Sequence, residues 1–268
     1  MNSASTRAVV VAPAGHSAPA LETRSLTRRF GGLTAVNGVS IRVESGTVHA
    51  VIGPNGAGKS TLVNLLSGDL APSHGEIILE GTDITRLGPP QRSLRGLGRS
   101  YQKTNVFLPL SVFENARLAA QSRAGSSLRF FRPVLREGAI NRQADEAIEA
   151  AGLSARRDRI VATLSHGEQR QVEIAMALAT APRVLLLDEP LAGMGAEESS
   201  GIVRLLSRLR ERHAILLVEH DMDAVFSLAD TLTVMVNGTV LETGSPASIR
   251  ASAAVQAAYL GSEDTHHD

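Results

Sequence analysis

Residues 53–60 read GPNGAGKS, a glycine-rich stretch that fits the phosphate-binding pattern G-x-x-x-x-G-K-S/T. Its glycines let backbone N–H groups turn toward one anion, and a following helix would add the positive end of its dipole. Lys59 can neutralise phosphate charge, Ser60 can offer a hydroxyl to Mg²⁺, and Thr61 can reach a phosphate oxygen. This phosphate loop therefore predicts binding of a nucleoside triphosphate. The candidate contacts are Gly53, Pro54, Asn55, Gly56, Ala57, Gly58, Lys59, Ser60 and Thr61.

Two adjacent acids follow an apolar run of strand length. The run Val184–Leu187 leads into Asp188 and Glu189, and Pro190 ends the strand because it has no N–H to donate. Carboxylates at the carboxyl end of a buried parallel strand reach the crevice where ligands bind. We assign Asp188 to Mg²⁺ and Glu189 to the proton of an attacking water. The alternative is a pair of surface acids that cap a strand.

A third motif marks the start of a helix. Ser165 and Glu168 stand at capping-box spacing before an apolar helical pattern, which predicts a well-capped helix in any protein. The Ser165 hydroxyl and the N–H of Gly167 would also be open to an anion. On these residues alone, both interpretations stay open.

Alternating α and β patterns supply the elements that must position these motifs. They predict an α/β fold with a parallel sheet and crossover helices, preceded by short antiparallel strands over residues 21–52. Strand patterns vanish between about residues 103 and 163, which predicts an inserted helical subdomain. Asn237-Gly238 predicts a type I′ hairpin turn. The predicted strands are 48–52, 75–80, 184–187, 215–218, 232–236 and 239–243, and the predicted helices are 59–66, 112–121, 140–151 and 196–212.

Composition excludes several classes of protein. The chain has 268 residues, 27 Lys and Arg against 27 Asp and Glu, and no cysteine. The neutral balance disfavours nucleic acid as a partner, and the lack of cysteine excludes disulfides and thiolate metal sites. No apolar run approaches the about 20 residues that span a bilayer. We interpret residues 1–20 as a disordered extension and 262–268 as a polar tail.

One basic stretch stands out against the neutral total. Residues 117–142 contain six Arg against the single acid Glu137, with Phe130 and Phe131 among them. A solvated helix and loop would explain this stretch, and so would a face near anionic lipid headgroups.

Taken together, the motifs resemble those of the ATP-binding cassette (ABC) family. The resemblance rests on GPNGAGKST at 53–61, LSHGEQRQ at 164–171, VLLLDEP at 184–190 and His220 in LLVEHD, and it covers roughly residues 21–261. It implies a P-loop NTPase of ABC type: a mixed sheet core, an antiparallel β subdomain and an inserted helical subdomain. It also implies that ATP and Mg²⁺ bind between two cassettes, so that the phosphate loop of one faces the signature segment of the other. The signature residues here are Leu164, Ser165, His166, Gly167 and Glu168.

The resemblance implies three further roles. Gln102 matches the glutamine that reaches Mg²⁺ and the attacking water, and His220 matches the switch histidine that binds the γ-phosphate. Phe30 matches the aromatic that stacks on adenine, although a plain core residue is the alternative. Two positions depart from the family: His166 replaces the usual glycine, and Gly195 replaces an acid or amide that would bond across the dimer.

The finer resemblance is to ATPases for uptake of branched-chain amino acids, a group that also includes importers of amides. It implies a peripheral subunit at the cytoplasmic membrane face, paired as a homodimer or as a heterodimer with a second ABC ATPase. Its other partners would be integral-membrane permease subunits and, indirectly, an extracytoplasmic solute-binding protein. The alternatives are a lipid or lipopolysaccharide export ATPase and a non-transport regulatory ATPase. The candidate permease groove is the apolar set Val106, Phe107, Leu108, Leu110, Val112 and Phe113, for which ordinary core packing is the alternative.

Overall fold

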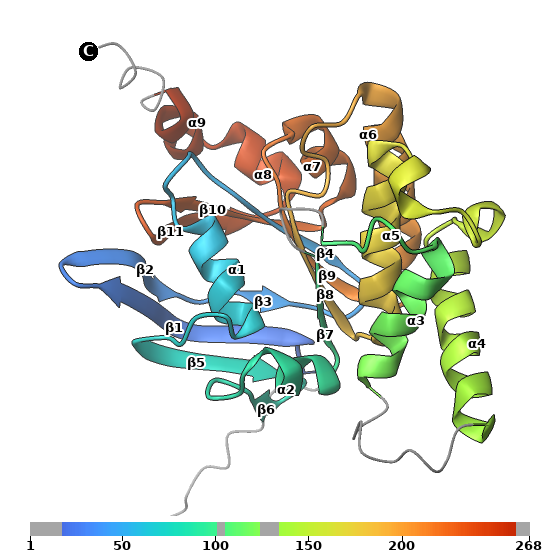
Figure 1. The fold of residues 1–268 in the computed structure, drawn as a ribbon. Helices are drawn as coiled ribbons and strands as arrows, with labels where there is room; N and C mark the ends of the chain where they lie inside the picture. Colours follow the sequence, from blue (N-terminus) through green and yellow to red (C-terminus); the bar gives the residue numbers. More distant parts are fainter. Residues whose placement is uncertain (1–17, 101–104, 124–133, 261–268) are drawn as a thin grey trace, which may run out of the picture.

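The computed structural model describes residues 18–100, 105–123 and 134–260, and it contains two sheets with a helix between them (Figure 1). The larger sheet has the strand order β11-β10-β4-β9-β8-β7, in which every neighbouring pair is parallel except β10 and β11. Its strands are β4 (Val48–Ile52), β7 (Leu97–Arg99), β8 (Val184–Asp188), β9 (Ala214–Val218), β10 (Thr231–Val236) and β11 (Thr239–Gly244).

The smaller sheet is antiparallel and lies on the other side of helix α1 (Lys59–Ser67) in Figure 1. It follows the order β2-β1-β5-β6, with β3 paired to β1. These strands are β1 (Leu21–Phe30), β2 (Leu33–Val39), β3 (Arg42–Val43), β5 (His74–Leu79) and β6 (Thr82–Asp83).

The central strands β4, β8, β9 and β10 of the larger sheet are buried on both faces, which explains their apolar runs. In β8, Leu185 and Leu187 belong to the core beneath the helices, whereas Val184 and Leu186 belong to the core shared with α1 and the smaller sheet. Period-two alternation therefore divides one apolar run between two cores. Asp188, the first acid of the pair, is the last residue of β8.

The remaining helices pack mainly around the larger sheet. Helices α3, α4 and α5 lie side by side in Figure 1, and their small apolar residues share one core. The described helices besides α1 are α2 (Pro89–Leu94), α3 (Val112–Ser122), α4 (Val134–Ala150), α5 (His166–Ala179), α6 (Ala196–Leu209), α7 (Met222–Leu228), α8 (Pro246–Ala251) and α9 (Ala253–Leu260). Within the described ranges, no helix is long and apolar enough to cross a membrane.

The structure confirms the predicted strands and helices to within a few residues, except that α4 begins earlier than expected. The predicted hairpin turn is confirmed, because Asn237 and Gly238 have φ angles of 49° and 78°. Residues 1–17 of the expected extension and the whole expected tail lie outside the described residues. Ala20, which was assigned to that extension, is buried, and its carbonyl accepts the N–H of Glu80 at 3.0 Å.

Two arginines of the basic stretch bond within the fold. Arg117 donates to the side chain of Asn141 at 3.0 Å, and Arg123 donates to the carbonyls of Ala181 at 3.0 Å and Leu94 at 3.3 Å. Phe130, Phe131 and the arginines between 124 and 133 lie outside the described residues, so the lipid-facing surface stays a prediction.

Candidate active site

The phosphate loop joins β4 to α1, and two of its glycines are required by close backbone packing. Gly53 and Gly58 have φ angles of 151° and 97°. A Cβ at Gly53 would stand 2.1 Å from the carbonyl oxygen of Met235, and one at Gly58 would stand 2.3 Å from that of Ala35. The loop is therefore wedged between β10 and β2, which fixes the direction of its N–H groups.

Lys59 begins α1 and is held inside the loop. Its buried Nζ donates to the carbonyl oxygens of Gly53 at 2.6 Å and Pro54 at 3.0 Å. Burial lowers the pKa of Lys59, and the carboxylates of Glu189 and Asp188 act against that shift. A cation close to two carboxylates, at the start of a helix, is suited to bind phosphate groups between them.

The loop lines a cavity of about 550 Å³ together with Glu189, the second acid of the pair. This volume falls within the about 300–1,000 Å³ that is usual for ligand pockets. Ser60 and Thr61 face it from α1, Leu33–Ala35 from β2, and Glu189 from the loop after β8. The structure thus brings together the two motifs that sequence analysis assigned to one nucleotide.

Asp188 ends β8 with a carboxylate that is suited to Mg²⁺. Its residue is 2% exposed, and among the described residues its Oδ1 has no hydrogen-bond partner. Its Oδ2 lies 3.8 Å from Nη2 of Arg99. Burial raises the pKa of Asp188, and Arg99 opposes that shift. A bound cation would satisfy this oxygen and lower the pKa of Asp188.

The donor set also fits Mg²⁺ in its complex with a nucleotide. Mg²⁺ keeps several waters and phosphate oxygens, so it needs only one or two protein ligands. In the described part of the chain, no three His, Cys, Asp or Glu side chains form a cluster for a metal ion. The hydroxyl of Ser60 and the carboxylate of Asp188 remain the fitting pair, and the third candidate, Gln102, lies outside the described residues.

Glu189 has a backbone conformation that residues other than glycine rarely adopt. Its φ angle is 49°, in the left-handed region, which costs of order 1–3 kcal/mol. Its N–H donates to the carbonyl of Val218 at 2.8 Å, and its own carbonyl accepts a bond from Nη2 of Arg170 at 2.9 Å. Strain that is held in place by neighbours is typical of functional sites.

His220 follows β9, the neighbour of β8 in the sheet. Asp188 pairs in register with Val218, so His220 stands two residues beyond the same edge. Its side chain is 65% exposed, and its Nδ1 lies 3.7 Å from Oε2 of the buried Glu219. His220 does not line the 550 Å³ cavity in this single chain.

The donors at the start of α5 bind the carboxylate of Glu198 in the same chain, so they are not open as the sequence led us to expect. The predicted capping box is confirmed: the Glu168 N–H donates to Ser165 Oγ at 3.2 Å, and the Ser165 N–H donates to Glu168 Oε2 at 3.1 Å. In addition, the Ser165 hydroxyl at 2.8 Å and the Gly167 N–H at 3.1 Å donate to Oε1 of Glu198. The Ser165 bond, followed by the Gly167 bond, lowers the pKa of Glu198.

Comparison with known proteins decides the family. A family model described as "ABC transporter" matches residues 36–192, more than half of the chain. The chain belongs to the ABC transporter family. A second model, "Branched-chain amino acid ATP-binding cassette transporter", matches residues 239–265.

Curated ABC relatives match over nearly their whole length. The chain is 39% identical to the high-affinity branched-chain amino acid transport ATP-binding protein BraF of Pseudomonas aeruginosa, over 91% of this chain and 99% of that protein. It is 36% identical to LivG of Escherichia coli K12, which has the same description, with the same coverage. The family and these relatives make the chain an ATPase of ABC type.

Solved ABC structures share the fold. An ATP-binding cassette of an ABC transporter in its ADP conformation superposes with a TM-score of 0.81 at 31% identity, covering 91% of this chain and 99% of that one. A nucleotide-free cassette gives 0.80 at 30% identity, with 90% and 98% covered. The predicted α/β P-loop fold of ABC type is therefore confirmed.

Within this ABC chain, the phosphate loop and the signature residues line different cavities. Ser165, Gly167 and Glu168 border a small cavity of about 130 Å³ beside Glu198. Leu164 is buried, and Nε2 of His166 lies 3.4 Å from the carbonyl oxygen of Ala192. In a single chain, the signature segment therefore does not line the cavity of the phosphate loop, and its contact with a nucleotide of another cassette stays a prediction.

Phe30 ends β1 and is not a core residue. It is 42% exposed, and the guanidinium of Arg28 lies 4.6 Å from its ring centroid. The packing alternative is therefore wrong, and stacking on adenine stays a prediction.

Sequence analysis missed four charged residues that shape the site. Arg170 binds the carbonyl of Glu189, Arg99 approaches Asp188, Glu198 binds the start of α5, and Glu219 binds the backbone around His220. A single signal was visible in the sequence. Glu219 follows five apolar residues and therefore stands at the end of a buried strand.

Proposed function

We propose that this chain is the ATP-hydrolysing subunit of an importer for branched-chain or related amino acids or amides, acting through separate permease subunits. The observation that carries the chemistry is the cavity that joins the phosphate loop to Glu189. The solute class is supported by the names of BraF and LivG, which this chain matches along 99% of their length. Lipopolysaccharide export and a regulatory role have no comparable support among these relatives.

The proposed mechanism follows from the charges around the cavity. ATP places its phosphates in the phosphate loop, where the loop N–H groups and Lys59 bind them. Ser60 and Asp188 would hold Mg²⁺, which would supply positive charge to the phosphates. Glu189 accepts a proton from the water that attacks the γ-phosphate, and His220 donates a hydrogen bond to that phosphate.

Two cassettes are required in this proposal. The signature residues Leu164–Glu168 bind the ATP of a second ABC ATPase, either a copy of this chain or a sister subunit. Gln102 completes the Mg²⁺ site, and Phe30 stacks on adenine. We keep residues 21–261 as the ATPase domain, with the helical subdomain at about 103–163, at the cytoplasmic face of the membrane.

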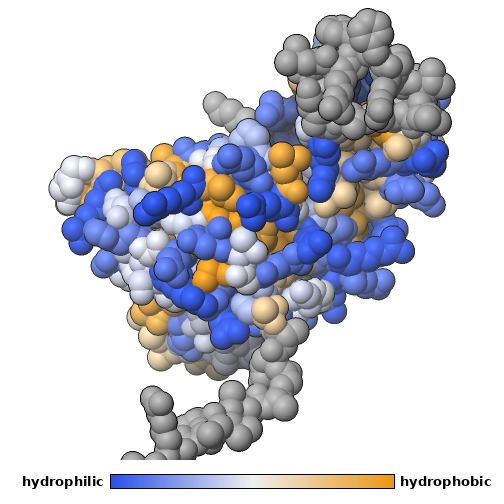
Figure 2. Space-filling view, turned by 90° about the horizontal axis from the view of Figure 1, so that it is seen from below, coloured by the Kyte–Doolittle hydropathy of each residue, from blue (hydrophilic) through white to orange (hydrophobic). Residues whose placement is uncertain are grey.

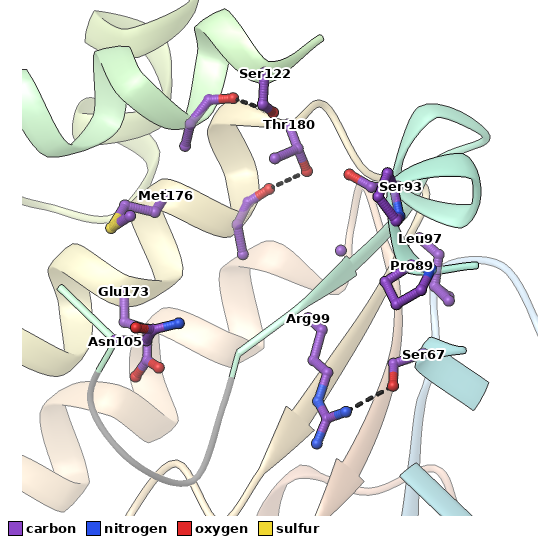
Figure 3. Close-up of a pocket in the computed structure, with 14 residues that line it drawn as sticks. Ser67, Pro89, Ser93, Leu97, Arg99, Asn105, Ser122, Glu173, Met176 and Thr180 are labelled. Carbon is purple, nitrogen blue, oxygen red and sulfur yellow. Dashed lines mark hydrogen bonds between the residues drawn. The ribbon is translucent and has the colours of Figure 1, made fainter. Parts of the chain in front are cut away.

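A hollow between α2, β7, α3 and α5 is the proposed dock for a permease helix. Its volume is about 380 Å³, and Figure 3 shows Pro89, Leu97, Asn105 and Met176 around it. Figure 2 shows apolar surface gathered near the middle of the face on which α2 lies. Asn105 lines the hollow, and it follows Gln102 closely in the sequence.

The groove predicted from the sequence is only partly available for docking. Phe107 and Leu108 are exposed, as expected for a docking surface. Val112 is wholly buried, and the ring of Phe113 lies 3.7 Å from the guanidinium of Arg157. Core packing therefore explains Val112 and Phe113 in that set.

The proposal is tested with the subunit copurified with its permeases in lipid vesicles. The wild type should couple ATP hydrolysis to the entry of labelled leucine. Glu189→Gln should bind fluorescent ATP normally and lose at least about 100-fold in turnover, because general-base catalysis contributes about 10²–10⁴. Lys59→Ala is the contrasting variant and should lose nucleotide affinity itself. Normal hydrolysis by Glu189→Gln would refute the base assignment, and ATP-dependent lipid movement without leucine entry would refute the importer.

A further inference from the structure

A buried carboxylate stands behind the two reacting segments of the site. Glu219 directly follows the last residue of β9, and its side chain is wholly inaccessible to solvent. A carboxylate removed from water costs several kcal/mol unless hydrogen bonds replace its hydration. The partners of Glu219 therefore indicate which part of the molecule that burial serves.

Each carboxylate oxygen of Glu219 binds a different loop. The N–H of Leu191 donates to Oε1 at 2.7 Å. The N–H of His220 donates to Oε2 at 3.0 Å, and the N–H of Asp221 donates to the same oxygen at 3.4 Å. One rigid group thus joins the loop after β8, which carries Glu189, to the segment after β9, which carries His220.

The bond to Leu191 completes the restraint on Glu189. The N–H of Glu189 is bound to Val218, and its carbonyl is bound to Arg170. Pro190 has no N–H, so Leu191 carries the next N–H along the chain that can be fixed. A residue with a φ of 49° keeps that conformation only when its surroundings hold it on both sides.

Helix capping does not account for Glu219. The helix that follows, α7, is capped by Asp221, whose Oδ1 accepts the N–H of Ala224 at 3.0 Å. Glu219 lies before this cap, at the end of β9. Its two oxygens bind the loops and not the helix.

We propose that Glu219 is a positioning residue that holds the base Glu189 and the γ-phosphate contact His220 in one arrangement. The proposal rests on the function proposed above. Phosphate charge entering the cavity would otherwise push the carboxylate of Glu189 away. The bond that the Leu191 N–H donates to Oε1 of Glu219 resists that movement. The bond from Oε2 fixes the backbone from which the His220 side chain reaches the phosphate.

The test compares Glu219→Gln with wild type in steady-state ATPase assays on the copurified transporter. The amide keeps the shape of the side chain, but its NH₂ group cannot accept an N–H bond, so one loop is released. We expect unchanged nucleotide affinity and KM, and a fall in kcat of about 10-fold, because one charge-assisted bond is lost. Glu219→Asp keeps the charge but is too short to reach both loops, and it should show the same fall in kcat.

Asp230→Asn provides a matched control. Asp230 Oδ2 likewise accepts a backbone N–H, that of Val48 at 2.8 Å, but at the opposite end of the parallel sheet. This variant should keep the wild-type kcat. Equal losses of kcat in Asp230→Asn and Glu219→Gln would mean that any lost carboxylate bond disturbs turnover, which would overturn the proposal.

A double-variant cycle separates positioning from general stability. If Glu219 acts through His220, Glu219→Gln should lower kcat much less in the His220→Ala background than in the wild type. Fully additive losses, or a lower melting temperature with normal kcat, would overturn the proposal. Failure of the proposed function is a different result, because it would appear as normal turnover in Glu189→Gln whatever Glu219 does.

Discussion

At the residue scale, the glycines of the phosphate loop share positive φ angles but differ in what surrounds them. Gly56 and Gly58 have φ angles of 78° and 97°. A Cβ at Gly56 would meet no atom within 4 Å, whereas one at Gly58 would stand 2.3 Å from the carbonyl oxygen of Ala35. Substitution at Gly56 therefore changes backbone strain alone, and substitution at Gly58 adds a clash with β2.

Alanine substitutions should separate these two costs. Gly56→Ala should lower the free energy of unfolding by about 1–2 kcal/mol, which is the cost of a left-handed residue. Gly58→Ala should cost at least about 3 kcal/mol, because the loop and β2 must also move apart. Urea unfolding measures both, and Gly32→Ala, where a Cβ meets no atom and φ is not positive, serves as the neutral control. Equal stability of Gly56→Ala and Gly58→Ala would contradict the packing argument.

The sequence indicates the side chains that we propose for phosphate, Mg²⁺ and water better than it indicates the residues that hold them in place. Lys59, Asp188 and Glu189 are recognisable because short motifs with fixed spacing carry their chemistry. The sequence shows that Glu219 follows an apolar run, but it does not show the partners of Glu198 and Glu219, because these include the N–H groups of Gly167 and Leu191, 31 and 28 positions away. Which N–H groups remain to be bound is decided only when the loops meet in the folded chain.

At the element scale, helix α5 connects the signature segment to the catalytic loop of the same chain. Arg170 and Glu173 lie one turn apart on it and form a buried ion pair. The other terminal nitrogen of the Arg170 guanidinium, Nη2, donates to the carbonyl of Glu189 at 2.9 Å. A movement of α5 would therefore be transmitted directly to Glu189, the strained residue that we propose as the base.

Removing this ion pair should separate stability from turnover. Arg170→Met takes away the ion-pair partner of a buried carboxylate, and it should cost about 3–5 kcal/mol of unfolding free energy. Adding Glu173→Leu should recover most of that loss, because an apolar pair of similar volume replaces two buried charges. Turnover should stay low in the double variant, because the carbonyl of Glu189 still lacks its donor. Urea unfolding and ATPase assays check the two parts, and wild-type turnover in the double variant would contradict the role of Arg170.

Elements with long apolar patterns were predictable, and short edge elements were not. The five residues of β8 are buried on both faces and read as a strand from sequence alone. The three residues of β7 lie at the sheet edge, and Gly98 fits there because a Cβ would stand 2.9 Å from the side chain of Pro182. Helix α2 starts at Pro89-Pro90, which marks a helix start but gives no apolar period. Tertiary packing decides such elements.

At the scale of the whole molecule, a buried histidine joins four strands. In β4, Nδ1 of His49 donates to the carbonyl of Arg42 in β3 at 2.9 Å. Its Nε2 then accepts from the hydroxyl of Thr233 in β10 at 2.8 Å, and Thr233 accepts from Thr243 in β11 at 2.8 Å. Each bond in this hydrogen-bond network fits the neutral imidazole, because the carbonyl of Arg42 can only accept. A second proton on His49 would reverse the bonds to both threonines.

This network should make the stability of the fold depend on pH. Burial lowers the pKa of His49 to about 4, against an ordinary value of 6.5. Since the unfolded chain takes up a proton below pH 6.5 and the folded chain does not, the contribution is fully present above 6.5. It is lost as the pH falls from 6.5 toward 4, by about 3 kcal/mol in total.

Other groups titrate in the same range, so His49→Gln provides the reference: their titrations cancel in the wild-type minus variant difference. Urea unfolding should show this difference shrinking by about 3 kcal/mol between pH 7.5 and pH 4. A difference that stays constant over that range would show that His49 is protonated equally in the folded and unfolded chain, and would rule out the neutral network across the four strands.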